Sequence, residues 1–146
     1  MSENKQTGVF TKEEQDAMRA RAKELKAEAK AAKNREEGEK AVMNAISQMG
    51  DVDKSLATKI HQIVKETAPS LWPKTWYGMP AYATTEGKII CFFQSASRFK
   101  VRYSSFGFQP DAKIDEGNMW ATSFALTKIT SAEEARIIEL VKKAVQ

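Results

Sequence analysis

Apolar side chains recur every three or four residues through the first half of the chain, which is the spacing that places them on one face of a helix. This pattern predicts three helices, over residues 12–33, 41–49 and 53–67. Thr11 and Glu14 have the spacing of a capping box, so the first helix is expected to begin there. Its apolar face consists mainly of alanine, so burying that face would contribute little free energy.

Beyond Pro69 and Pro73 the pattern becomes that of extended strands. A first strand is expected from near Thr75, with Pro80 lying at an edge or a bend. Further strands are predicted over residues 88–94, 98–103 and 119–126, with a hairpin turn at 84–87, an irregular connection over 106–118 and a last helix from 131. The 88–94 run is apolar, as in a central strand covered on both faces.

Helices and strands are segregated along the chain, because three helices precede a meander of strands and one helix follows it. Segregation of this kind favours an α+β fold over a doubly wound α/β fold. Short turns imply antiparallel pairing, so an antiparallel sheet of four to five strands backed by helices is predicted. Residues 34–38 are expected to break the helical pattern, and the chain is divided into a charged helical arm, residues 1–40, and a domain, residues 41–146.

Length and composition fit one independently folding domain with an appendage. The chain has 146 residues and a single cysteine, Cys91, so no disulfide can form within it. No apolar stretch is long enough for a membrane helix, and the first residues are polar, unlike a signal peptide. We therefore expect a cytoplasmic protein with no membrane partner.

Charge is distributed unevenly along the chain. Residues 11–40 contain nine basic and eight acidic side chains, and this near balance argues against a nucleic-acid-binding arm. Residues 72–110 contain five basic side chains and one acidic side chain, a net charge of +4. All aromatic residues except Phe10 lie within residues 72–124, so the basic and the aromatic regions coincide.

This coincidence defines a candidate binding site. Alternation over residues 98–103 would place Arg98, Lys100 and Arg102 on one face of a strand, where they could hold a phosphate or carboxylate. The alternative is a solvent-facing sheet surface whose charges only discourage edge pairing. In the aromatic stretch, Trp76, Tyr77 and Tyr82 could stack on the ligand, and Met79 could form a wall of the pocket. Aromatic residues at this density more often belong to a hydrophobic core, and Met79 suits a core and a pocket wall equally well.

Catalytic and metal chemistry finds little support in the sequence. His61, the only histidine, is expected to be a half-buried residue on the third helix and not a general base. Cys91 lies in an apolar run and is expected to be an inert, buried thiol, with a reactive nucleophile as the alternative. Asp111, Asp115 and Glu116 could bind a hard cation weakly, with a solvated loop as the alternative. No catalytic residue, metal ligand or cofactor is assigned.

Several segments together resemble the YdhG-like proteins, small bacterial domains mostly of unknown function. The residues that carry the resemblance are Tyr77-Gly78-Met79-Pro80-Ala81-Tyr82, Ala68-Pro69 before them, and the segments 87–93, 125–126 and 133–144. The resemblance covers about residues 41–145 and implies an α+β fold with a curved antiparallel sheet. One branch is described as a frataxin-like intracellular iron chaperone. Relatives often have a histidine in the strand that here reads Arg98-Phe99-Lys100, and shorter relatives lack the charged arm.

Three functions follow as hypotheses. The first is a non-enzymatic binding module for an anionic small ligand or partner, held beside residues 76–82. The second is an iron chaperone, with iron as a cofactor that only the resemblance implies. The third is an enzyme of unknown type acting through Tyr77, Tyr82 or Cys91. The identity of the partner and the oligomeric state are left open.

Overall fold

The computed structural model describes residues 10–33 and 35–146, and the surroundings of the side chains at 10–26 and 35–146. The chain divides into two compact units, residues 1–30 and 31–146. Its elements are α1 (Lys12–Lys33), α2 (Arg35–Ser47), α3 (Asp51–Thr67), β1 (Trp72–Trp76), β2 (Met79–Ala83), β3 (Ile89–Gln94), α4 (Ala96–Phe99), β4 (Ser104–Phe108), β5 (Ser123–Leu126) and α5 (Ser131–Ala144). Among the described residues, no helix combines the length and apolarity needed to cross a membrane.

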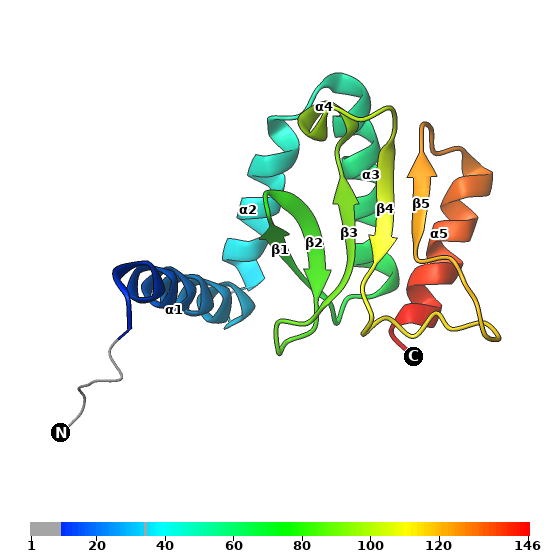
Figure 1. Ribbon diagram of the computed structural model, residues 1–146. Coiled ribbons are helices and arrows are strands. Elements are labelled where there is room, and N and C mark those ends of the chain that lie inside the picture. The colour runs from blue at the N-terminus through cyan, green and yellow to red at the C-terminus, as the bar shows by residue number, and fades with distance from the viewer. Residues whose placement is uncertain (1–9, 34) are drawn as a thin grey trace. The chain divides into compact units, whose positions relative to one another are not determined.

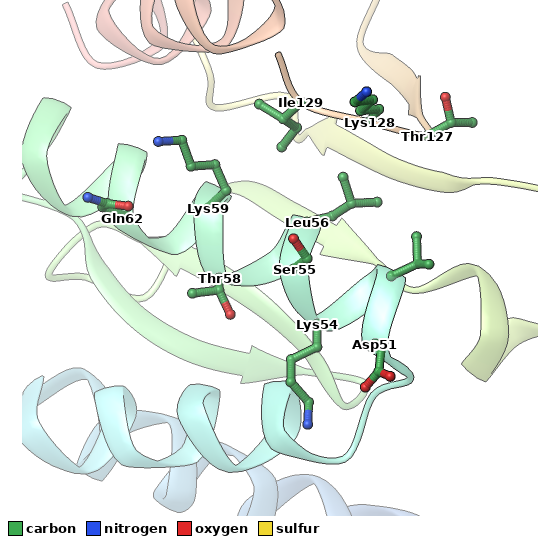
Figure 2. A pocket seen from close by; sticks show the side chains of 11 residues that line it. Asp51, Lys54, Ser55, Leu56, Thr58, Lys59, Gln62, Thr127, Lys128 and Ile129 are labelled. Carbon is green, nitrogen blue, oxygen red and sulfur yellow. The ribbon is translucent and has the colours of Figure 1, made fainter. Parts of the chain in front are cut away.

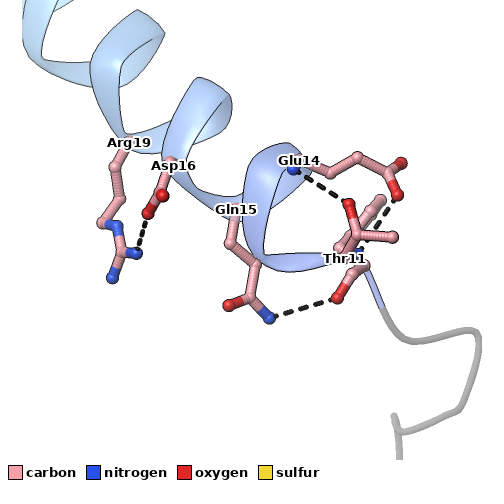
Figure 3. A network of polar contacts seen from close by, with 6 residues as sticks. Thr11, Glu14, Gln15, Asp16 and Arg19 are labelled. Carbon is pink, nitrogen blue, oxygen red and sulfur yellow. Dashed lines mark hydrogen bonds and ion pairs between the residues drawn. The ribbon is translucent and has the colours of Figure 1, made fainter.

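The first unit contains most of α1, which begins at the predicted residue. The amide of Glu14 donates to Thr11 Oγ1 and the amide of Thr11 donates to Glu14 Oε1, each at 3.1 Å (Figure 3). This reciprocal pair confirms the capping box. Arg19 and Asp16 form an exposed ion pair at 2.6 Å, and every side chain over residues 10–26 is exposed. Local contacts of this kind, each worth a few tenths of a kcal/mol (~0.3–0.5), support the helix.

The second unit is built on a curved antiparallel sheet of five strands in the order β1-β2-β3-β4-β5 (Figure 1). The predicted α+β class is confirmed. The apolar run at 88–94 is confirmed as the central strand, β3. The predicted hairpin turn at 84–87 is confirmed too, because Gly87 has a φ of +89° and its amide donates to the Thr84 carbonyl at 2.9 Å.

The main core lies between one face of the sheet and the helices α2, α3 and α5. Val42 of α2, Ile60 of α3 and Val141 of α5 are fully buried against Phe93 and Phe106 of the central strands. Helices α2 and α3 have the predicted apolar face, whereas the face of α5 differs from the expected one, because Ala135 is exposed and Ile137 is buried. Burying a side chain the size of valine or isoleucine contributes about 1.5–3 kcal/mol.

A second, smaller cluster covers the opposite face of the sheet. Ala81, Ala83 and Ile89 are buried there beneath the rings of Trp76 and Phe92, and no helical residue belongs to the cluster. The two rings pack edge to face with their centroids 5.2 Å apart. This face is therefore covered by strand side chains alone within the described part of the chain.

Two predicted boundaries near the helices differ from the structure. The break expected over residues 34–38 is wrong, because α2 begins at Arg35 and Gly38 is buried inside it; Asn34 lies outside the described residues. Helix packing on β1 outweighs the low helix propensity of a single glycine, which costs about 1 kcal/mol. The whole of α2 lies in the second unit, although the predicted arm ended at residue 40.

Three strand boundaries differ from the predicted ones. The first strand begins at Trp72, three residues before the expected start. Residues 104–108 form β4, although the last three of them were assigned to an irregular connection. Gly107 inside β4 has a packing role, because a Cβ there would lie 2.5 Å from Cζ of the Phe92 ring. The last strand, β5, starts at Ser123 and not at residue 119.

Candidate functional site

The aromatic heptapeptide forms a tight hairpin. Trp76 pairs with Met79, so the connection between β1 and β2 consists only of Tyr77 and Gly78. Both have positive φ, +50° and +77°, which is the backbone of a type I′ turn. Tyr77 is 76% exposed at the tip. Pro80, expected at an edge or bend, lies within β2. It pairs with β1 only, because the pairing of β2 with β3 begins one residue later, at Ala81.

Arg98 lies directly on this turn. Its Nη1 donates to the Gly78 carbonyl at 3.1 Å, and a Cβ at Gly78 would lie 2.2 Å from its guanidinium nitrogens. The positive φ favours glycine at position 78, and a larger residue there would in addition displace the exposed Arg98 guanidinium from the turn. The contact brings the Tyr77 tip next to the basic segment, as the candidate site required.

The predicted strand over residues 98–103 is wrong. Ala96–Phe99 is instead a short helix, α4, in which the Ser95 hydroxyl accepts from the Arg98 amide. Lys100 ends it in the left-handed conformation, φ +54°, and the Val101 amide closes the turn onto the Ala96 carbonyl at 3.0 Å. Arg98, Lys100 and Arg102 consequently do not share one face of a strand.

Asp53 of α3 holds this segment in place. Its Oδ2 accepts from Ser95 Oγ at 2.5 Å, from Ser97 Oγ at 2.7 Å and from the Ser97 amide at 3.0 Å. Its Oδ1 accepts from Ser104 Oγ at 3.1 Å. Both ends of the loop are thus fastened to one buried carboxylate. Burial raises the pKa of Asp53, but the hydrogen bonds from the three serines outweigh burial and hold its pKa below the ordinary value.

The segment between these fastened ends is exposed throughout. All six residues from Arg98 to Tyr103 are exposed, and basic side chains alternate with Phe99, Val101 and Tyr103. Arg102 lies over the Tyr103 ring with its Cζ 5.1 Å from the ring centroid. Within the described part of the chain, no carboxylate forms an ion pair with any of the three cations.

The other candidate residues lie apart from this loop. Trp76 is half-buried on the helix-free face of the sheet and Met79 is buried. Tyr82 is buried on the opposite face, beneath the helices. The structure therefore brings Tyr77 and Arg98 together on the surface, while Tyr82 belongs to the core.

Tyr82 shares a polar cluster with His61, which the sequence did not pair. The Tyr82 hydroxyl and His61 Nδ1 are 2.8 Å apart, and burial raises the pKa of Tyr82 well above its ordinary value. His61 Nε2 lies 3.3 Å from Glu39 Oε2 without hydrogen-bond geometry, and Glu39 Oε2 accepts a hydrogen bond from Lys65 Nζ at 2.9 Å. His61 was expected to be half-buried, but only 7% of its surface is exposed. Both its ring and the Tyr82 hydroxyl beside it are enclosed by the fold, so neither group is accessible to a substrate from the surface.

Cys91 is confirmed as a buried thiol. It is fully buried in the core, and burial raises its pKa, so the reactive thiolate is disfavoured. The acidic residues Asp111, Asp115 and Glu116 do not form a ligand set. Among the described residues, no three side chains of histidine, cysteine, aspartate or glutamate are grouped so that they could hold one metal ion.

A separate groove of about 820 Å³ lies between the first half of α3 and the residues that follow β5 (Figure 2). Its apolar floor includes Leu56 and Ile129, and three lysines line it: Lys54, Lys59 and Lys128. Lys59 is paired with Glu134 at 3.1 Å. The sequence does not predict this groove, because its two walls are about seventy residues apart in the chain and each reads as an ordinary polar surface.

Comparison with known proteins identifies no relative. The chain matches no family model, no curated protein and no solved structure. Function therefore rests on the geometry of the site.

Proposed function

We propose that the protein is a non-enzymatic binding module for an anionic small ligand or partner, held at the loop of residues 98–103 beside the Tyr77 turn. The observation that supports this most strongly is the set of three exposed cations without a carboxylate partner in the described chain. Exposed cations are normally solvated, but these three stand on a loop whose ends Asp53 holds fixed. Less backbone entropy is then lost when a ligand binds.

The alternating side chains support a ligand with both anionic and apolar parts. Phe99, Val101 and Tyr103 are 37%, 49% and 39% exposed, beside the cations. Guanidinium and ammonium groups make charge-assisted hydrogen bonds to phosphate or carboxylate. The neighbouring apolar surfaces would cover the uncharged part of the ligand.

The other two functions gain no support. The enzyme hypothesis lacks an accessible nucleophile beside a base, because Cys91 is buried and His61 is bonded to the core residue Tyr82. The iron chaperone depends on the YdhG-like resemblance alone, and the acidic cluster supplies no ligand set among the described residues. The resemblance itself stays a prediction, with a curved antiparallel sheet as the fold it implies.

Charge removal at the loop tests the proposal. Two probes cover its two ligand classes: a fluorescent hexaglutamate peptide followed by anisotropy, and inorganic phosphate followed by calorimetry, both at low ionic strength. We expect Lys100→Asn/Arg102→Gln to weaken binding about tenfold or more, since each lost charge-assisted contact is worth roughly 1 kcal/mol or more. Asparagine is chosen because it tolerates the positive φ of Lys100.

A matched variant separates this site from overall charge. Lys113→Gln/Lys142→Gln removes two charges from exposed positions outside the loop and should leave the affinity nearly unchanged. Equal weakening by both double variants, or no saturable binding of either probe, would contradict the proposal.

A further inference from the structure

The outer edge of β5 is unprotected. β5 is the last strand of the sheet, and residues 119–127 contain neither a charged residue nor a proline. Natural sheet edges usually carry lysine, proline or a bulge that discourages a further strand. Met119 is 90% exposed, and the other side chains from Trp120 to Ser123 are exposed as well.

The register shows which backbone groups face outward. The Phe108 amide donates to the Thr122 carbonyl at 2.7 Å, so these two residues form a hydrogen-bonded pair. Pairs alternate along an antiparallel ladder, and β4 and β5 pair in the register Phe106↔Phe124. Ser123 and Ala125 therefore direct their amides and carbonyls away from β4. Their outward groups have no partner among the described residues.

A groove adjoins this edge. It has a volume of about 640 Å³ and lies between β5 and α5, which run side by side (Figure 1). Apolar side chains form its floor, among them Phe124, Ile137 and Leu140. Arg136 stands at its rim, exposed, with its Cζ 5.4 Å from the centroid of the Phe124 ring and no ion-pair partner among the described residues.

We propose that this groove binds an extended peptide segment of another protein, which adds to β5 as a sixth strand. The outward groups of Ser123 and Ala125 would form the backbone hydrogen bonds, and alternate apolar side chains of the peptide would enter the groove. An acidic residue of the peptide would pair with Arg136. Strand addition of this kind obtains affinity from the main chain and specificity from the side-chain groove.

A single strand fits this edge better than a second copy of the chain. Antiparallel pairing of two β5 strands about a twofold axis normal to the sheet would place both helix layers on the same side. The two α5 helices would then compete for the space above the shared edge, since α5 already lines the groove. A peptide adds no second helix above the edge, and an acidic residue in it would give Arg136 the ion-pair partner that is missing among the described residues.

Selection from a display library of random peptides of about twelve residues tests the proposal. We expect enriched peptides with alternating apolar residues and one acidic residue. Their affinity should fall about tenfold or more with Ala125→Pro, which removes an outward amide without removing a bond to β4. Ala125→Val keeps that amide and should bind normally, whereas Arg136→Gln should bind several-fold more weakly.

Three results would overturn the inference: no enriched peptide, enriched peptides that bind the Ala125→Pro variant equally well, or self-association of the protein through β5. Backbone NMR of the wild-type protein gives a readout that does not depend on folding of a variant, because the amides of Ser123 and Ala125 should shift when a selected peptide is added. Peptides sensitive only to Lys100→Asn/Arg102→Gln would support the anion-binding loop and refute this site, so the two proposals fail separately.

Discussion

Replacing Asp53 by alanine should destabilise the domain, because both oxygens of its buried carboxylate accept hydrogen bonds. Three serine hydroxyls and the Ser97 amide donate to its carboxylate. A hydrogen bond to a charged group contributes about 1.5–3 kcal/mol, but hydroxyls can rotate toward other acceptors and the amide cannot. We therefore expect Asp53→Ala to lower the free energy of unfolding by about 3 kcal/mol, and Asp53→Asn by roughly half of that, because asparagine keeps one acceptor oxygen.

Urea unfolding at neutral pH measures this change. The matched control is Asp51→Ala, an exposed residue in the first turn of the same helix, which should cost about 0.5 kcal/mol through the helix dipole. Hydrogen exchange should also accelerate in the loop of residues 98–103 when Asp53 is replaced. Equal costs for the two variants would refute the view that Asp53 fastens the loop.

The pH dependence follows from the same carboxylate. The pKa of Asp53 is lower in the folded protein than its ordinary value of 3.8, so ionisation favours the folded state. Its contribution is complete above that ordinary value and is lost as the pH falls through the folded pKa. The difference in stability between wild type and Asp53→Asn should therefore shrink as the pH falls below about 4. A difference that stays constant down to pH 2 would contradict this reasoning.

Two further substitutions, with one control, test the buried cluster and the hairpin. Tyr82→Phe leaves His61 Nδ1 without its partner and should lower the free energy of unfolding by about 1–2 kcal/mol, whereas Tyr77→Phe at the exposed tip should have almost no effect in the same urea titration. Gly78→Ala should cost about 1–2 kcal/mol, because alanine disfavours a φ of +77° and displaces the Arg98 guanidinium; an unchanged midpoint of unfolding would show that the turn is not constrained.

Much of the architecture could be read from periodicity. Helical spacing gave α1 and α3, and the apolar run at 88–94 gave the central strand, because these patterns report directly on burial. The alternation over residues 98–103 misled for a physical reason. Its apolar members are exposed, so alternation there does not record a buried face, and the hydrogen bonds to Asp53 decide the conformation.

The candidate site could be predicted only in part. The concentration of basic and aromatic residues located Tyr77 and Arg98, which the structure brings together. Asp53 was missed because its partners lie 42 to 51 residues away, and nothing local distinguishes it from a helix-capping residue. The groove beside β5 was not predicted, because β5 is an edge strand. Which strand lies at the edge of a sheet follows from the strand order, and the local sequence does not show that order.

The most direct test of the anion-binding proposal locates the ligand on the wild-type protein. Backbone amide resonances would be followed while hexaglutamate is added at low ionic strength. Saturable shifts confined to residues 98–103 and to Tyr77 and Gly78, weakened by added salt, are the predicted result. Shifts concentrated elsewhere, for example around Lys54 and Lys128, or the absence of saturable shifts in the loop, would contradict it.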